Sequence, residues 1–333
     1  VVATNPAAQE LASLPEQDCR GLRLEELVPW PRLHEALQAC RRNGKAQAFE
    51  LTEDSSLLRT LAIRVRALPG LGCVVGIDDQ SRLKRLESLR RDFVANVSHE
   101  LKTPLAAIQG FVETLQDDPK MPFATRHRFL DRIARQTHRL TTLVADLLTL
   151  SRLDDDSGLA HAHEPCDFVA VLRETLRDLM PLAERRRVTL LAVLPEHALW
   201  VRSDREALRQ VAGNLIDNAL KYTPEGGEVR VTIDAGEQQL RFAVADTGIG
   251  LSPEDQERVF ERFYRVDRAR SRDLGGTGLG LSIVKNTVRN LGGSVGVDSE
   301  LGKGSTFWVE LPCEAAPGAA SLPLDGERRS AAI

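Results

Sequence analysis

Residues 93–111 read FVANVSHELKTPLAAIQGF, and this stretch decides how the rest of the chain is interpreted. Apolar residues at helical spacing, such as Phe93 and Val97, predict that it lies within one long amphipathic helix. Pro104 falls inside that helix, where a proline costs about 3 kcal/mol because it removes a backbone donor and crowds the preceding turn. So costly a residue indicates a functional constraint close to His99.

His99 lies near the edge of the apolar stripe, and two interpretations of it are open. A single helical histidine is most often structural or simply exposed, but a neutral imidazole is also a nucleophile near neutral pH when its second nitrogen loses its proton. Glu100 is the adjacent candidate base. Helix neighbours point about 100° apart, so spacing alone does not establish their contact. Thr103 and Pro104 are expected to loosen the helix one turn further on.

The composition excludes several classes of protein. The chain has 333 residues and a formal net charge of -4, so we expect more than one domain and no nucleic-acid partner. Its five cysteines are scattered and include no C-x-x-C pair, which argues against a disulfide framework or a zinc site and favours a reducing cytosol. The chain starts at Val1 and has no signal peptide or long apolar run, so we expect a cytoplasmic fragment whose membrane anchor lies upstream.

The first part of the chain predicts a small mixed domain. Asn5 is a candidate cap for a short helix, and the runs TLAIRVRAL (60–68) and GCVVGID (72–78) predict two antiparallel strands. The long helix follows, and the stretch DDPKMP (117–122) interrupts it.

A second long helix is predicted from about Thr125 to Leu153, and its apolar positions alternate spacings of four and three. This pattern is an a/d seam, and a two-helix hairpin is too thin to bury it, so dimerisation into a four-helix bundle is expected. Its polar member either sets the register or is a tolerated, partly exposed glutamine. The seam comprises Phe129, Ile133, Gln136, Leu140, Leu143, Leu147 and Leu150.

Two later stretches combine a predicted element with polar residues. RQVAGNLIDNALKYTPEGG (209–227) predicts a helix with Asn214 and Asn218 on one face, and an asparagine carbonyl is a hard ligand suited to magnesium. Lys221 lies within reach of a phosphate. LRFAVADTGIGL (240–251) predicts a strand ending at Asp246, whose carboxylate could accept a hydrogen bond from the exocyclic amino group of adenine.

Two more stretches complete the set. ERFYRVDRARSRDLGGTGLGLSIVKNTV (261–288) contains a charged segment expected to act as a mobile lid, and then glycines that lead into a helix near Leu279. Amides at that helix start could face phosphates. LGGSVGVDSELGKGSTFWVELP (291–312) predicts two paired strands that close a sheet.

The stretch around His99 resembles the phosphoacceptor box of the sensor histidine kinases of bacterial two-component systems. The four later stretches, in this order, resemble the ATP-binding domain shared by histidine kinases, heat-shock-90 chaperones, gyrases and mismatch-repair ATPases. Within the sensor kinases, the chain is similar over nearly its whole length to the phosphate-regulon type. The resemblance implies an α+β multidomain fold. Its expected parts are a PAS-like domain truncated at its start (1–80), a dimeric four-helix-bundle phosphotransfer hairpin (81–157), an α/β sandwich ATP-binding domain (158–313) and a disordered tail (314–333).

The resemblance also implies roles for individual residues. His99 is the phosphorylated residue, Glu100 assists as acid or base, and Thr103 positions a water when the partner is dephosphorylated. Asn218 holds magnesium and Asp246 binds adenine. The remaining implied nucleotide-binding residues are Asn214, Lys221, Tyr222, Gly248, Gly250, Gly276, Gly278 and Gly280.

The function implied is autophosphorylation from ATP and Mg²⁺, followed by transfer to an aspartate of a separate response regulator. The chain is expected to form a homodimer, to act in phosphate-starvation signalling and to dephosphorylate the same regulator, with its parent protein anchored in the bacterial inner membrane. Alternatives are a sensor kinase of another pathway, a protein that acts chiefly as a phosphatase, and an ATP-binding interaction module. A metal site at His161 and His163 is disfavoured, because no third ligand is near them in the sequence.

Overall fold

The computed structural model describes residues 1–14, 19–53, 59–70, 72–154, 164–236, 239–266 and 276–313. It divides into two compact units, Val1–Val97 and Ser98–Ile333, which are described separately. The predictions for Gly275, for most of the lid, for His161 and His163 and for the tail fall outside the described residues.

The first unit is a small antiparallel sheet with helices. The sheet order is β1-β2-β3, and the two predicted strands are confirmed as β2 and β3, paired antiparallel. Strand β1 and the helix before it were not predicted from the sequence. The predicted cap at Asn5 is confirmed, because its Oδ1 accepts from the Ala8 amide at 2.9 Å. The elements are α1 (Pro6–Leu11), α2 (Leu24–Leu27), α3 (Pro31–Asn43), β1 (Gln47–Glu53), β2 (Arg59–Leu68) and β3 (Gly72–Asp79).

The helical hairpin forms as predicted. Helix α4 (Ser81–Asp117) crosses from the first unit into the second, and α5 (Phe123–Asp154) follows after a short break. The rings of Phe111 and Phe129 pack between the two helices with centroids 5.7 Å apart. Pro104 is buried and does not end α4, which continues to Asp117.

The predicted seam of α5 has a second partner within the chain. Leu143 and Leu150 are 2% and 1% exposed, because they pack against Leu279 and Ile283 at the start of helix α10. We call these four residues the docking cluster. The C-terminal part of the seam is therefore covered by the sandwich of the same chain, and dimerisation of the hairpin stays a prediction.

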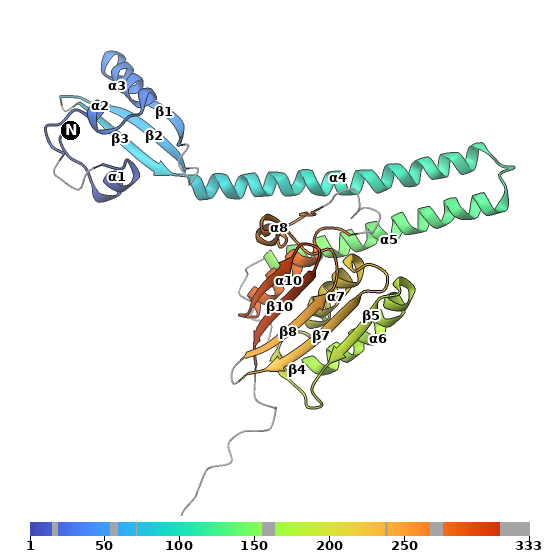
Figure 1. Ribbon diagram of the computed structural model, residues 1–333. Coiled ribbons are helices and arrows are strands. Elements are labelled where there is room, and N and C mark those ends of the chain that lie inside the picture. Colours follow the sequence, from blue (N-terminus) through green and yellow to red (C-terminus); the bar gives the residue numbers. More distant parts are fainter. Residues whose placement is uncertain are drawn as a thin grey trace, which may run out of the picture. The chain divides into compact units, whose positions relative to one another are not determined.

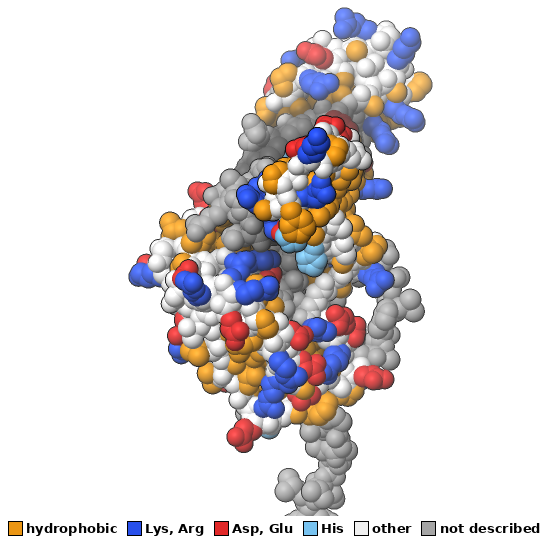
Figure 2. Space-filling model, turned by 90° about the vertical axis from the view of Figure 1, so that its right-hand side faces the viewer, with side chains coloured by type: hydrophobic (Ala, Val, Ile, Leu, Met, Phe, Trp, Pro, Cys, Tyr) orange, Lys and Arg blue, Asp and Glu red, His pale blue; other side chains and the backbone are white. Residues whose placement is uncertain are grey.

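Another apolar stripe of the hairpin is exposed. It combines residues of both helices. Figure 2 looks onto the end of the hairpin and shows further hydrophobic side chains at the surface of that end. The members of the stripe in the second unit are Leu105, Val112, Leu130, Val144 and Leu148.

The rest of the second unit is an α/β sandwich, as predicted. Its five-stranded sheet has the order β5-β7-β8-β10-β9, with β5 and β7 parallel and the other neighbours antiparallel. Helices α6, α7 and α10 cover one face of this sheet (Figure 1), and a single apolar core fills the layer between them. A small second sheet pairs β4 with β6.

The elements of the sandwich are β4 (Pro165–Asp167), α6 (Phe168–Arg186), β5 (Thr189–Val193), β6 (Trp200–Arg202), α7 (Arg205–Tyr222), β7 (Glu228–Ala235), β8 (Gln239–Asp246), α8 (Pro253–Arg258), α10 (Gly280–Asn290), β9 (Ser294–Glu300) and β10 (Gly304–Pro312). None of the helices in the described ranges combines the length and apolarity that crossing a bilayer requires.

Candidate nucleotide pocket and phosphoacceptor histidine

A pocket opens between α7, the end of β8 and the start of α10, with two residues of α5 in its wall. All the predicted nucleotide-binding residues line it except Gly248. They are Asn214, Asn218, Lys221, Tyr222, Asp246, Gly250, Gly276, Gly278 and Gly280.

Helix α7 supplies one wall of the pocket. Its apolar residues, such as Leu215, face the core, so the two asparagines four positions apart face the pocket together. Asn214 Nδ2 donates to the Gly280 carbonyl at 3.3 Å and thereby joins α7 to the start of α10. Lys221 forms an ion pair with Asp217 one turn before it.

Asn218 meets the chemical requirement for holding magnesium. Its side chain lines the pocket, and no hydrogen bond from a described residue occupies its amide. Mg²⁺ prefers one or two hard oxygen ligands from the protein and completes its shell with phosphate and water, so one amide oxygen here suffices.

Asp246 stands at the end of β8, partly buried in the pocket wall. Its Oδ1 accepts from the Gly248 amide at 2.8 Å, and no ion pair reaches it within the described part of the chain. Burial raises the pKa of Asp246, while backbone hydrogen bonds from Gly248 and Ser305 act against that rise. A Cβ at position 248 would lie 2.5 Å from Asp246 Oδ1 and 2.7 Å from the Tyr222 carbonyl oxygen, so a glycine is needed to orient this carboxylate.

Two pocket glycines are required by backbone geometry. Gly250 has φ +67°, and a Cβ there would lie 2.0 Å from the Glu300 carbonyl oxygen. Gly278 has φ +74°, and its carbonyl accepts from the Phe263 amide at 2.8 Å. These contacts fix the turn after β8 and the loop before α10 against their neighbours.

The loop before α10 is also held by side chains. Thr277 Oγ1 accepts from the Leu279 amide at 3.3 Å and donates to Asp146 Oδ2 of α5 at 2.8 Å. Arg265 donates to the Gly276 carbonyl. Next to Arg265, the Tyr264 hydroxyl donates to an oxygen of Asp255 at 2.6 Å, which anchors the described start of the lid segment.

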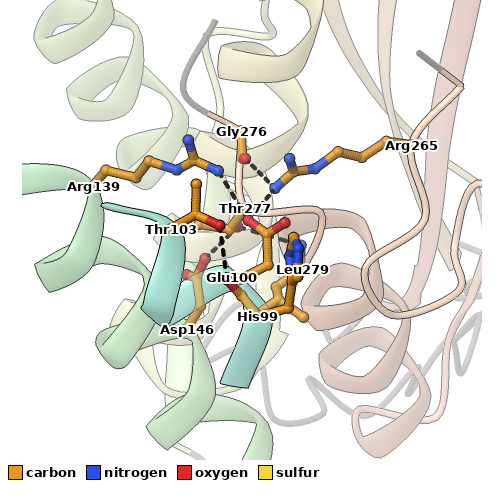
Figure 3. A network of polar contacts seen from close by, with 9 residues as sticks. All are labelled: His99, Glu100, Thr103, Arg139, Asp146, Arg265, Gly276, Thr277 and Leu279. Atoms are coloured by element: carbon orange, nitrogen blue, oxygen red, sulfur yellow. Dashed lines mark hydrogen bonds and ion pairs between the residues drawn. The ribbon is translucent and has the colours of Figure 1, made fainter. Parts of the chain in front are cut away.

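His99 is exposed on α4, and Glu100 beside it joins the hairpin to the sandwich (Figure 3). Glu100 Oε2 accepts from Arg139 Nη2 of α5 at 2.9 Å and from Arg265 Nη2 at 3.3 Å. Thr103 Oγ1 donates to the His99 carbonyl at 3.1 Å. His99 itself is not among the residues that line the pocket.

The charges of this ion network are largely removed from water. The side chains of Glu100, Arg139 and Arg265 are 21%, 13% and 6% exposed. Burial lowers the pKa of Arg265, and the neighbouring Arg139 acts in the same direction, whereas Glu100 acts against both. One carboxylate therefore separates two cations that would otherwise repel each other in a poorly solvated site.

Several residues of this region were not predicted from the sequence. Arg139, Thr142 and Asp146 lie on α5, and Arg265 and Thr277 flank the lid. Asp146 directly precedes the seam residue Leu147, and this carboxylate at the edge of an apolar stripe was the available signal. The two arginines gave no signal, because the chain has many and their contact with Glu100 depends on tertiary structure.

Comparisons with known proteins agree with this geometry. Residues 89–156 match the His Kinase A (phospho-acceptor) domain, and residues 203–315 match the Histidine kinase-, DNA gyrase B-, and HSP90-like ATPase family. The chain belongs to the sensor histidine kinases.

Individual sensor kinases are similar over most of the chain. The sensor-like histidine kinase SenX3 of Mycolicibacterium smegmatis is 41% identical over 242 residues, covering 72% of this chain and 62% of that protein. Sensor histidine kinase WalK of Bacillus subtilis is 40% identical over 245 residues, covering 72% of this chain and 39% of WalK. The chain thus spans only part of the length of these sensor kinases.

One solved structure has a similar fold over most of the chain. Histidine kinase ThkA, crystallised in complex with the response regulator protein TrrA, has a TM-score of 0.55. The match covers 93% of this chain and 92% of ThkA at 22% sequence identity, so it shows a shared fold.

We predict that Asp246→Asn weakens ATP binding at least about tenfold, because a hydrogen bond to a charged acceptor is worth about 1.5–3 kcal/mol. We also predict that it raises the thermal unfolding midpoint of the nucleotide-free sensor kinase. Burial raises the pKa of this carboxyl above its ordinary 3.8, so the folded state binds the proton more tightly than the unfolded state. The resulting cost to stability sets in as the pH rises from 3.8 through the raised pKa, and it is complete above that pKa.

Scanning calorimetry with and without ATP measures both effects. The difference in midpoint between the two proteins should be present above the raised pKa and should shrink as the pH falls through that pKa toward 3.8. A variant that unfolds at a lower temperature at neutral pH, or that binds ATP like the unaltered protein, would contradict the role given to Asp246.

Proposed function

We propose that this chain is the catalytic part of a sensor histidine kinase that phosphorylates itself on His99 and passes the phosphoryl group to an aspartate of a response regulator. The observation that carries the proposal is the combination, in one compact unit, of an exposed histidine beside a fixed carboxylate and a pocket with the residues of a nucleotide site. The two family matches support the same pairing of domains.

In the phosphorylation step, a neutral ring nitrogen of His99 attacks the γ-phosphorus of ATP in line with the leaving oxygen. The bond from that phosphorus to the bridging oxygen breaks, and ADP departs. Glu100 receives the proton of the second ring nitrogen. The two arginines both bind Oε2, so they fix the orientation of the carboxylate, and no described residue hydrogen-bonds to Oε1.

The nucleotide is held by the residues that line the pocket. Asp246 accepts from the amino group of adenine, and the loop from Gly276 to Gly280 lies against the phosphates at the start of α10. Lys221 supplies a cation near them. Magnesium held by Asn218 would offset charge on the phosphates when it is bound.

Because His99 does not line the pocket, the proposal requires the sandwich to change position on the hairpin before transfer. The contacts that would have to break include the docking cluster, the bond from Arg265 to Glu100 and the bond from Thr277 to Asp146. We therefore assign the described arrangement to a resting state of the kinase.

The proposed partners are a second copy of the chain and a receiver domain. The exposed hairpin stripe of Leu105, Val112, Leu130, Val144 and Leu148 supports dimerisation, because exposed apolar residues at heptad-like spacing are stabilised by partner helices. The complex of ThkA with TrrA supports a response regulator as the phosphoryl acceptor.

We propose the finer assignments on sequence resemblance. These are the PAS-like nature of the first unit, a role in phosphate-starvation signalling and anchoring of the full-length protein in the inner membrane. All three build on the assignment of the chain as a sensor kinase. The similarity to SenX3 and WalK, which covers 72% of this chain, supports that assignment.

Incubation with γ-labelled ATP and magnesium tests the central proposal. We expect a label that is stable to alkali and lost in acid, because a P–N bond has this pattern of stability, and that is absent from His99→Gln. His138→Gln, on the exposed surface of α5, is the matched control and should label normally. Labelling of His99→Gln, or no label in a protein that binds ATP, would contradict kinase activity at His99.

A phosphatase activity toward the regulator is the second candidate function. Thr103 is exposed one turn after His99, where its hydroxyl could orient an attacking water. We expect Thr103→Ala to slow dephosphorylation of the phosphorylated regulator at least about tenfold while the rate of His99 labelling stays within about twofold. An unchanged dephosphorylation rate would exclude Thr103 from this role, and Thr114→Ala, with the same helical hydrogen-bonding pattern, is the control.

A further inference from the structure

Asp146 is a carboxylate from the hairpin that forms part of the wall of the nucleotide pocket. It lies on α5, between the docking-cluster residues Leu143 and Leu150, and every other pocket residue in the described ranges except Thr142 belongs to the sandwich. Its Oδ2 accepts a hydrogen bond from Thr277 Oγ1 at 2.8 Å, as Figure 3 shows. Asp146 thus joins α5 directly to the loop that precedes α10.

The surroundings of Asp146 make its charge unfavourable. Burial raises the pKa of this carboxyl, and the hydrogen bond from Thr277 and the positive charge of Lys221 oppose that rise only in part. Lys221 is itself paired with Asp217, which also lines the pocket. A triphosphate in the same pocket would add several negative charges close to a carboxylate that has little solvent to screen it.

Thr277 carries the effect of this carboxylate to the loop. It lies between Gly276 and Gly278, and its Oγ1 also accepts from the Leu279 amide, so one hydroxyl both caps the start of α10 and holds α5. Any movement of the loop toward phosphates changes the hydrogen bond to Asp146.

We propose that Asp146 and Thr277 form a nucleotide-sensitive latch, a positioning pair in which the carboxylate of α5 holds the sandwich on the hairpin and is displaced by the triphosphate of a bound nucleotide. The inference rests on the proposed function in that the pocket binds ATP. Binding of the triphosphate and docking of the sandwich oppose each other, so by linkage a bound triphosphate weakens docking by the same factor by which docking weakens triphosphate binding. ATP itself therefore loosens the resting arrangement.

Calorimetric titration with a non-hydrolysable ATP analogue, and separately with adenosine, tests the latch. Asp146→Asn removes the charge and keeps an acceptor for Thr277. We expect it to tighten binding of the analogue about three- to tenfold, as loss of a partly buried like charge does, and to leave adenosine binding within about twofold. Asp131→Asn, an exposed carboxylate on the same helix, should change neither.

Hydrogen exchange of residues 143–150 supplies the second readout. In the unaltered protein the analogue should lower protection of this segment and adenosine should not, and in Asp146→Asn the analogue should have a smaller effect. Thr277→Val, which removes the donor at equal size, should lower protection without any nucleotide.

The outcomes separate the latch from the function on which it rests. Weaker binding of the analogue by Asp146→Asn, as expected if the carboxylate held magnesium, would overturn the latch, and so would equal changes for analogue and adenosine. Failure of the unaltered protein to bind either ligand would instead contradict the proposed nucleotide site.

Discussion

The resting arrangement depends on the ion pairs that the carboxylate of Glu100 forms with two arginines. This carboxylate accepts from Arg139 of its own hairpin and from Arg265 of the sandwich, at 2.9 and 3.3 Å, and all three side chains are largely withdrawn from water. Removing the carboxylate would leave two cations side by side in a poorly solvated site, an arrangement that costs about 3–5 kcal/mol when a buried pair is broken. Glu100 thus serves structure and proposed chemistry at once, since it adjoins His99.

Apolar contacts beside this network also hold the sandwich on the hairpin. Leu143 and Leu150 of α5 pack on Leu279 and Ile283, which directly follow the glycine-rich loop. The residues that would receive the nucleotide and those that dock on the hairpin are therefore neighbours on one short segment. A change in the loop cannot leave the docking cluster unaffected, and this continuity links pocket occupancy to the position of the sandwich.

Much of this organisation was predictable because it depends on local patterns. The two hairpin helices, the strands β8, β9 and β10 and the asparagine face of α7 follow from periodicity and turn residues, and the structure contains all of them. The loop glycines were identified as pocket residues from the resemblance to the ATP-binding domain of histidine kinases. Gly248 does not line the pocket itself. Its missing side chain leaves room for the Asp246 carboxylate and the Tyr222 backbone, and both of these residues line the pocket.

The parts that could not be predicted are those that depend on one element meeting another. Periodicity showed that α5 has an apolar stripe, but not that its C-terminal part would pack on α10 while the adjacent Val144 stays exposed. Contacts such as Arg265 with Glu100 join residues far apart in the chain, and the local patterns of a single sequence do not predict such pairs. Pro104 was expected to loosen α4, yet it is buried within a continuous helix.

Methyl NMR of Ile283 and Leu150 tests most directly whether the Glu100 network holds the sandwich on the hairpin. Both side chains are at most 1% exposed, so their signals report docking. Glu100→Gln and Arg265→Met should each shift these signals in the same direction, toward those of solvated methyl groups. Arg258→Met, an exposed arginine paired with Glu261, should not. Unshifted Ile283 and Leu150 signals in both network variants would contradict the account, because docking would then not depend on the shared carboxylate.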